Sequence, residues 1–304
     1  MGVELCQRSA AARELFSAAD ELTGLPLTTV CHEGPRERLT RTEFAQPAVV
    51  ATSLAASRAL AEQLGRRGLQ LSPTCCAGHS VGELAAFAVA GAFTIADCLT
   101  LVAARGRLMA EASETADGSM AAIIGLDESA LAEICSRASK ETSALVQIAN
   151  LNAPGQIVLS GDRRSLALAC ELAQAAGAKR VVQLDVSGPF HSAYMQPAAE
   201  RFRSAVERIE ILRPAAPVVL NVTAQPCVEP DAIREELVTQ VTSPVRWSDS
   251  VKTMLDMGCT IFVELGPGRV LSGLVKRIAR DATTLSVEDG ESLDTTVEKL
   301  CTLL

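Results

Sequence analysis

The feature that most constrains the fold of this chain is the run Gly78-His79-Ser80-Val81-Gly82. It follows a short apolar stretch at 74–77 and precedes an alanine-rich stretch at 83–92 with the composition of a buried helix. A G-x-S-x-G run between a strand and a helix is typical of a sharp turn that lifts the serine hydroxyl clear of the backbone. Glycines suit such a turn because the two backbones approach too closely for a β-carbon. The sequence therefore predicts a strand–turn–helix unit with Ser80 at its tip.

Length and composition favour an ordinary soluble globular protein of one or two domains. The chain has 304 residues, of which 48% are hydrophobic and 21% charged, and its net charge is −8. This acidic balance, without a basic stripe interleaved with aromatic residues, argues against nucleic-acid binding. No run of 18 apolar residues occurs, so we expect no membrane span, and the first residues lack the pattern of a signal peptide.

The ten cysteines are scattered and include no C-x-x-C pair. They are interpreted as small buried hydrophobic residues in a reducing cytoplasm, with a disulfide framework as the alternative. No group of His, Cys and Asp residues has the spacing of metal ligands, so neither a metal nor a redox cofactor is implied. We therefore expect a cytoplasmic protein without a cofactor.

Apolar periodicity predicts helices over 9–22 and 47–64, and Thr94 with Asp97 resembles a capping box that opens a helix to about residue 109. From residue 118 the pattern changes to the order β-α-β-β-α-β, which is the ferredoxin-like arrangement. Its expected strands are 120–124, 145–149, 156–160 and 181–184, and its expected helices are 128–138 and 163–176.

After residue 186 strands again alternate with helices, which predicts a largely parallel sheet covered on both faces. The expected helices are 197–209, 247–257 and 270–279, and the expected strands are 218–220 and 260–265.

A serine hydroxyl needs an adjacent base to become a good nucleophile. The chain offers three histidines. His79 directly precedes the serine in the turn and is expected to point away from Ser80 as a packed, hydrogen-bonded residue. His32 is expected to lie in a charged loop and to be solvated. His191 follows Gly188 and Pro189 in a loop between a strand and a helix, where functional residues collect, and is the base by elimination.

Five motifs, in order along the chain, resemble the malonyl-CoA:acyl carrier protein transacylase family of fatty-acid and polyketide synthesis. The first is the Ser80 motif with the following Glu83; the others begin at Ala104, Asn150, Phe190 and Glu264 and read ARGRLM, NLNAPGQ, FHS and ELGPG. The resemblance runs from the first expected helix to about residue 280. It implies an α/β fold: an α/β-hydrolase-like large domain with a parallel sheet, formed by 1–114 and 187–304, and an inserted ferredoxin-like subdomain at 115–186.

The resemblance also implies a catalytic dyad in which Ser80 forms the acyl ester and His191 acts as base and then acid. The family orients its histidine by a backbone carbonyl, and the corresponding stretch here is 243–247; Arg246 stands where the family often has a polar amide, a change that a backbone contact tolerates. Arg105 resembles the arginine that binds the free carboxylate of malonyl, and a guanidinium suits this task because it donates two parallel charge-assisted hydrogen bonds.

Substrate-binding positions are implied at further residues of these motifs. Phe190 and Val81 resemble the residues of malonyl-preferring members, although Phe190 could equally be a core residue, and Met109 and Asn150 complete the expected substrate-binding set. The Val81 N–H is one expected donor to the oxyanion of the tetrahedral intermediate. The family's second donor lies in a Phe-Pro-Gly-Gln-Gly motif after its first strand, which does not occur here, and Gln46 occupies a different position.

The sequence therefore predicts a malonyltransferase whose partners are malonyl-CoA and an acyl carrier protein, with Lys276, Arg277 and Arg280 as candidate carrier contacts. An acyl hydrolase of the same fold is one alternative; such members commonly lose the carboxylate-binding arginine, so Arg105 favours transfer. An inactive carrier-docking protein is the other, suggested by the expected lack of an N-terminal strand and one oxyanion donor.

Overall fold

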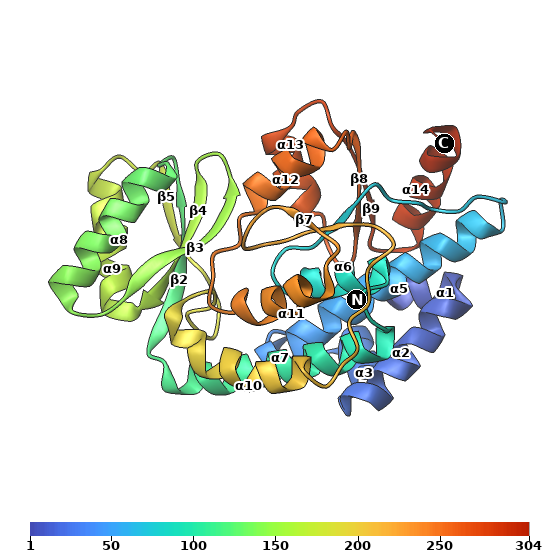
Figure 1. Cartoon of the computed structure of the whole chain (residues 1–304), viewed down its shortest axis with the longest axis horizontal. Coiled ribbons are helices and arrows are strands. Elements are labelled where there is room, and N and C mark those ends of the chain that lie inside the picture. Colours follow the sequence, from blue (N-terminus) through green and yellow to red (C-terminus); the bar gives the residue numbers. More distant parts are fainter. Residues whose placement is uncertain (304) are drawn as a thin grey trace.

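The structure is a computed structural model that describes residues 1–303, and it is a mixed α/β protein (Figure 1). Its first part is helical. The helices are α1 (Val3–Arg8), α2 (Ala10–Thr23), α3 (Leu27–Glu33), α4 (Arg36–Leu39) and α5 (Thr42–Gly65). Helix α2 begins as predicted, because the Ser9 side chain accepts a hydrogen bond from the Ala12 N–H and so caps the first turn. Helix α5 begins five residues before the predicted start and contains Pro47 at the loss of one backbone hydrogen bond.

The predicted strand–turn–helix unit is present. Strand β1 (Cys76–Ala77) leads through the turn at Ser80 into α6 (Gly82–Ala90), and α7 (Ile95–Thr115) follows. The Thr94 hydroxyl caps α7 by accepting the Asp97 N–H at 3.0 Å, as the sequence predicts, but the helix runs to Thr115 instead of ending near residue 109. Helices α5 and α7 pack against each other, and α6, which follows the turn, packs against both.

The middle of the chain forms a distinct unit, green and yellow-green at the left of Figure 1. Its elements follow the predicted order: β2 (Gly118–Ile124), α8 (Glu128–Thr142), β3 (Val146–Ala153), β4 (Gln156–Asp162), α9 (Arg163–Ala175) and β5 (Arg180–Gln183). The four strands form one antiparallel sheet in the order β3-β4-β2-β5. Helices α8 and α9 pack side by side on this sheet around a core that includes Leu131, Leu159 and Leu166.

The chain then returns to the larger part of the molecule. Its elements are η1 (Ala193–Met195), α10 (Gln196–Val206), β6 (Val218–Val219), β7 (Pro226–Cys227), α11 (Pro230–Thr239), α12 (Trp247–Asp256), β8 (Ile261–Leu265), α13 (Val270–Ile278), β9 (Thr283–Val287) and α14 (Gly290–Leu303). The predicted helices and strands of this region are all found; α11, β7, β9 and α14 were not predicted.

The strands of the larger part lie in two sheets instead of the single largely parallel sheet expected. Strand β1 pairs with β6 in parallel, β7 adds to β6 antiparallel, and β8 pairs with β9 in a separate parallel pair. Strands β1 and β6 contain only two residues each, so their ladder holds few hydrogen bonds, and the surrounding helices supply most of the packing.

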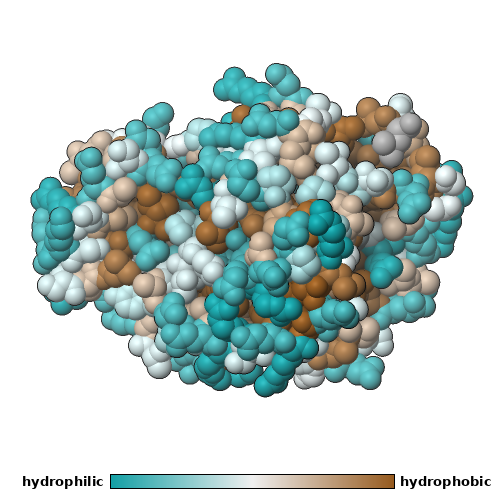
Figure 2. Space-filling view, viewed as in Figure 1, coloured by the Kyte–Doolittle hydropathy of each residue, from teal (hydrophilic) through white to brown (hydrophobic). Residues whose placement is uncertain are grey.

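The main apolar core lies under α2, α5, α6, α7 and α10, and a smaller cluster around Trp247 and Val251 lies between α12, α13 and β6. The face in Figure 2 mixes hydrophilic and hydrophobic residues. Exposed large apolar side chains are few and dispersed along the chain, with Val270 the most exposed at 69%. No helix within residues 1–303 is both long and apolar enough to cross a bilayer.

Candidate active site

The turn at Ser80 is strained and sterically closed on one side. Ser80 has a φ of 52°, a left-handed conformation that is uncommon outside glycine. A β-carbon on Gly78 would lie 2.1 Å from the backbone carbon of Gly82, so only glycine fits there, as the motif predicts. Gly82 has open space around its Cβ position, so the steric argument does not apply to it. The close backbone contact therefore requires one glycine of the motif and not both.

Ser80 and His191 meet although 111 residues separate them in the sequence. The Ser80 Oγ lies 2.6 Å from the His191 Nε2. On the other side of the ring, Nδ1 lies 2.9 Å from the Gln240 carbonyl oxygen and 3.1 Å from that of Ser243. Carbonyl oxygens only accept hydrogen bonds, so Nδ1 carries the proton and Nε2 presents its lone pair to the serine hydroxyl. The ring is thus held in the tautomer that can accept the serine proton.

The electrostatic setting keeps this histidine neutral. His191 is 3% exposed. Burial is the main reason that the pKa of His191 is lowered from 6.5 to about 3, and the positive charge of Arg105 is the second. The imidazole is therefore unprotonated near pH 7, which is the form that accepts a proton.

Arg105 lies directly beside the nucleophile. It extends from α7, is 2% exposed, and its Nη2 lies 3.3 Å from the Ser80 Oγ. The same Nη2 donates to the Gln240 Oε1 at 2.8 Å, and Nη1 donates to the Gln46 Oε1 at 2.6 Å. Burial lowers the pKa of Arg105 to about 10, so the guanidinium stays charged near pH 7. A buried cation whose neighbours in contact are neutral oxygens can accept an anionic group at this position.

The other predicted site residues surround these three. Val81 is half-buried and ends the turn as the N-cap residue of α6, so its N–H has no partner within the helix and lies next to Ser80. Met109, one turn beyond Arg105 on α7, is buried, and its sulfur accepts from the Gln46 amide at 3.4 Å. Phe190 is half-buried against the main core and against the apolar face of the small unit.

Asn150 lies on β3, at the place where the small unit meets the larger part. It is buried, and its backbone forms a parallel bridge with Val245, close to Ser243 in the segment that faces His191. The backbone of β3 therefore fixes the small unit against the loop that carries the acceptors for the histidine.

The rings of the two remaining histidines pack against other side chains. His79 points away from the dyad, as expected: its Nε2 lies 2.8 Å from the Asn152 Oδ1, and its ring packs 5.6 Å from that of Trp247. The expectation that His32 lies solvated in a loop is wrong, because His32 is half-buried on helix α3, its Nε2 is buried, and its ring packs 5.4 Å from Phe16. The amphipathic helix that α3 forms places the ring against α2.

Sequence reasoning missed the polar residues beneath the turn. Gln240, Asn221 and Glu236 are each at most 5% exposed and were not singled out. A signal for two of them exists, because Glu236 and Gln240 stand four residues apart on the same side as the buried Ile233 and Leu237. Polar residues on the apolar face of a helix are unusual and often mark a buried network.

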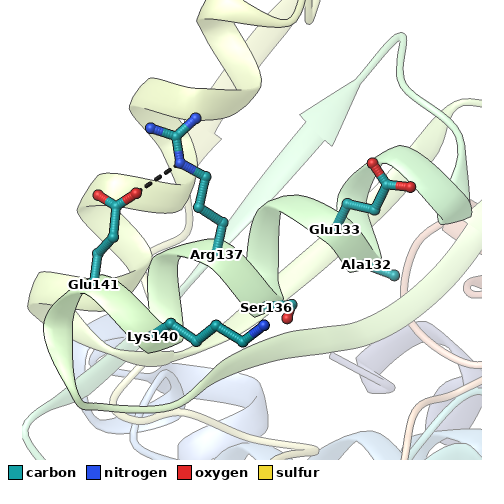
Figure 3. Close-up of a pocket in the computed structure, with 6 residues that line it drawn as sticks. All are labelled: Ala132, Glu133, Ser136, Arg137, Lys140 and Glu141. Atoms are coloured by element: carbon teal, nitrogen blue, oxygen red, sulfur yellow. Dashed lines mark hydrogen bonds and ion pairs between the residues drawn. The ribbon is translucent and has the colours of Figure 1, made fainter.

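A surface hollow on α8 is separate from this site. It is a shallow groove on the outer face of α8, lined by Ala132, Glu133, Ser136, Arg137, Lys140 and Glu141. Figure 3 shows these side chains along a single helix, with Arg137 paired to Glu141. Such i, i+4 pairs are ordinary on solvated helices, and none of the dyad residues lines the groove. Within residues 1–303 no group of three or more His, Cys, Asp or Glu side chains is placed to hold a metal.

A strained serine, a neutral histidine within hydrogen-bond distance and a buried arginine beside them are the arrangement that acyl transfer through a serine ester requires. The chain belongs to the acyl transferase family, since the family model described as "Acyl transferase domain" matches residues 1–294. Several curated relatives carry the name malonyl CoA-acyl carrier protein transacylase. The relative from Bacillus subtilis is 42% identical over 99% of this chain and 92% of its own length, and that from Escherichia coli K12 is 38% identical over 94% and 90%.

Solved structures agree with these relatives. The malonyl CoA-acyl carrier protein transacylase of Coxiella burnetii superposes with a TM-score of 0.93 at 37% identity, covering 99% of this chain and 93% of that one. A malonyl-transacylase solved in complex with its type II PKS acyl-carrier protein superposes with a TM-score of 0.92 at 36% identity, covering 98% and 94%. Nearly the whole chain therefore shares the fold of these enzymes.

Proposed function

We propose that this protein transfers a malonyl group from malonyl-CoA to the phosphopantetheine thiol of an acyl carrier protein, through a malonyl ester on Ser80. The function serves fatty-acid or polyketide synthesis. The observation that carries the proposal is the position of Arg105, whose buried guanidinium lies 3.3 Å from the Ser80 Oγ. A dyad alone is compatible with hydrolysis or transfer of many acyl groups, whereas a cation at this distance selects an acyl group that ends in a carboxylate.

The first half-reaction loads the enzyme. The malonyl carboxylate binds Arg105, and the Ser80 Oγ attacks the thioester carbonyl while His191 Nε2 takes the hydroxyl proton. The oxyanion of the tetrahedral intermediate receives the Val81 N–H, the backbone donor next to the nucleophile. Collapse of the intermediate breaks the C–S bond, and the protonated His191 returns the proton to the leaving CoA sulfur.

The second half-reaction reverses these roles with a new thiol. His191 takes the proton of the carrier's phosphopantetheine thiol, and the thiolate attacks the malonyl ester. The Ser80 oxygen leaves and regains a proton from His191. Because Gln240 and Ser243 hold the opposite ring nitrogen, the imidazole keeps its orientation through both steps.

The proposal assigns selectivity to residues around the dyad. Phe190 and Val81 limit the space beside the acyl chain, which favours malonyl over α-branched groups, and Met109 and Asn150 complete the substrate-binding wall. The proposal also divides the chain into an α/β-hydrolase-like catalytic domain at 1–114 and 187–304 and a ferredoxin-like subdomain at 115–186. The sheet order β3-β4-β2-β5 supports this description of the subdomain.

An acidic carrier protein is expected to dock where α13 meets the subdomain. Lys276 and Arg277 are exposed on α13, Arg280 is exposed just after it, and Arg277 donates to the Gln156 side chain at the start of β4. The exposed Lys179 bonds through its backbone to Ile124 at the same end of the subdomain. A cytoplasmic location is part of the proposal, and it is supported by ten cysteines that are all unbonded.

Mass spectrometry of the intact protein tests the proposal. Incubation with malonyl-CoA should add one malonyl group at Ser80, and a carrier protein bearing phosphopantetheine should then remove it and become malonylated. Ser80→Ala should abolish both steps, with transfer reduced roughly 10³-fold or more. A malonyl ester that water cleaves at the same rate with or without carrier would instead support the hydrolase alternative. Transfer that persists in Ser80→Ala would contradict the assigned nucleophile.

A further inference from the structure

A layer of polar side chains lies directly beneath the Ser80 turn in a core that is otherwise apolar. Its members come from three parts of the chain, and each is at most 5% exposed. They are Glu83 on α6, Asn221 after β6, Glu236 on α11 and Gln240, which ends α11. Only Gln240 touches the dyad and Arg105 at once, so the layer connects the site to the fold beneath it.

Glu83 is the common acceptor of this layer. Its Oε1 accepts the Asn221 N–H at 2.7 Å and the Asn221 Nδ2 at 2.9 Å. Its Oε2 accepts the Gln240 Nε2 at 2.7 Å. An ionised carboxylate only accepts hydrogen bonds, so it forces the NH₂ end of each amide toward itself and the oxygen end of each amide elsewhere.

The oxygen ends that Glu83 directs away are the ones that hold the site. The Asn221 Oδ1 accepts the Ser80 N–H at 2.7 Å, which fixes the strained turn from below. The Gln240 Oε1 accepts Arg105 at 2.8 Å, and its Nε2 also reaches the Ser80 carbonyl at 2.8 Å. Reversal of either amide would place an N–H group against an N–H group at Ser80 or at Arg105.

A second carboxyl group makes this arrangement electrostatically possible. Glu236, on α11, is a second buried carboxyl group of this layer, and the pKa values of Glu83 and Glu236 depend on each other. The other charged or titratable groups that face the layer are Arg105 and the neutral His191. Burial raises the pKa of both glutamates, and the charge of Glu236 raises that of Glu83 further, so the pair retains one proton. Glu83 accepts three N–H contacts, which favour its ionised form, and the Val222 N–H donates to the Glu236 Oε1 at 2.9 Å.

We propose that Glu83 is a positioning residue of this enzyme: its carboxylate accepts hydrogen bonds from Asn221 and Gln240 and so sets the orientation of the two amides that hold the nucleophile and the arginine. The role of the positioned groups rests on the acyl-transfer function proposed above, whereas the hydrogen-bond geometry does not.

The test uses Glu83→Gln and a readout that needs neither malonyl-CoA nor a carrier, namely the rate at which a fluorophosphonate labels Ser80. The introduced amide would present an NH₂ group to one of the two existing amides and turn it over. We expect the labelling rate, per folded molecule by circular dichroism, to fall roughly 10- to 100-fold, since a small misplacement of reacting groups has effects of this size. Malonyl loading should fall in parallel.

Glu236 variants supply the rescue test. Glu236→Gln supplies an N–H donor for Glu83 and keeps an oxygen for the Val222 N–H, so its labelling rate should fall less than that of Glu236→Ala. At alkaline pH the parent enzyme should lose labelling rate as the pair loses its proton, and Glu236→Gln should lose less. Glu235→Gln is the matched control, because Glu235 is the adjacent residue on α11 and forms only an exposed ion pair with Arg203; its rate should equal that of the parent.

Two results would overturn the positioning role: a parent-like labelling rate in folded Glu83→Gln, or equal losses in Glu236→Gln and Glu236→Ala. A parent protein that labels at Ser80 but transfers no malonyl group would instead contradict the proposed function and leave the labelling comparison intact. The two proposals can therefore fail separately.

Discussion

At the scale of single residues, the charge of Arg105 acts on two partners. In the proposed function it binds the malonyl carboxylate, and it lowers the pKa of His191 in addition to the larger effect of burial. A bound carboxylate would compensate this charge and make the imidazole a stronger base. Malonyl would then be favoured over acetyl in the chemical step as well as in binding.

We expect Arg105→Ala to lower kcat/KM for malonyl-CoA roughly 10- to 100-fold, since a hydrogen bond to a charged group contributes about 1.5–3 kcal/mol. Removal of the positive charge raises the pKa of His191, so the acid limb of the pH–rate profile should move to higher pH. Steady-state kinetics from about pH 2.5 to pH 8 measure both effects, because the acid limb of the parent lies near the His191 pKa of about 3.

Arg107→Ala is the control, because Arg107 is exposed two residues further along α7 and pairs only with Glu111. An unchanged acid limb in Arg105→Ala would contradict the electrostatic link to His191.

At the scale of elements, the turn between β1 and α6 depends on one glycine more than on the other. A β-carbon on Gly78 would collide with backbone atoms of Gly82, and backbone moves aside less easily than the end of a flexible side chain. We expect Gly78→Ala to lower the free energy of unfolding by about 2 kcal/mol or more. Gly82→Ala should change it by less than about 1 kcal/mol, because the site is open and alanine favours the first turn of α6.

Urea denaturation of both variants measures this difference. Equal destabilisation by the two substitutions would show that backbone flexibility, and not the close contact at Gly78, governs the turn.

Helix α13 holds the basic residues that we propose contact the carrier protein. Arg277→Glu with Lys276→Glu should raise the KM for the carrier protein about tenfold and weaken its dependence on salt, since charges at the edge of an interface act mainly on association. Malonyl loading of Ser80 should be unaffected. Lys299→Glu and Arg67→Glu, at exposed positions away from α13, together make the control of equal charge change; a similar rise in KM for the control would assign the effect to net charge alone.

At the scale of the whole molecule, the buried titratable groups give stability an unusual pH dependence. The pKa of His191 is lowered in the folded state, so this residue favours unfolding at acid pH, and its effect disappears above about pH 6.5. The glutamates have raised folded-state pKa values. Their stabilising contribution is complete below about pH 4.5 and is lost as pH rises toward the folded-state pKa.

Stability should therefore decline above pH 6.5, where only the glutamate pair still titrates among these groups. The slope has an upper limit of about 1.4 kcal/mol per pH unit for one proton. Glu236→Gln removes one of the coupled carboxyls, so its stability relative to the parent should improve between pH 5 and pH 8. Urea denaturation at each pH tests this; a constant difference between the two proteins would show that the pair does not share a proton.

The parts of this protein that sequence reasoning predicted well are those encoded by neighbouring residues. The order of strands and helices from 118 to 184 follows from apolar periodicity, and the caps of α2 and α7 follow from Ser9 and from Thr94 with Asp97. The motif at Ser80 predicts its own turn, because the close backbone approach at Gly78 is a local requirement. His191 could be named as the base because the chain has only three histidines and its motif matches a known family.

Only the tertiary structure decided which residues surround the nucleophile. Glu83 meets Asn221 and Gln240 across sequence separations of 138 and 157 residues, and no local pattern encodes such contacts. The division of the strands into two sheets and the burial of His32 against Phe16 likewise depend on how distant segments pack. Hydrogen bonds and apolar periodicity within one element are short-range, so the sequence alone predicts most of the elements and the Ser80 turn. Burial, pKa values and amide orientations depend on every neighbour in space, so only the folded chain determines how its serine is held.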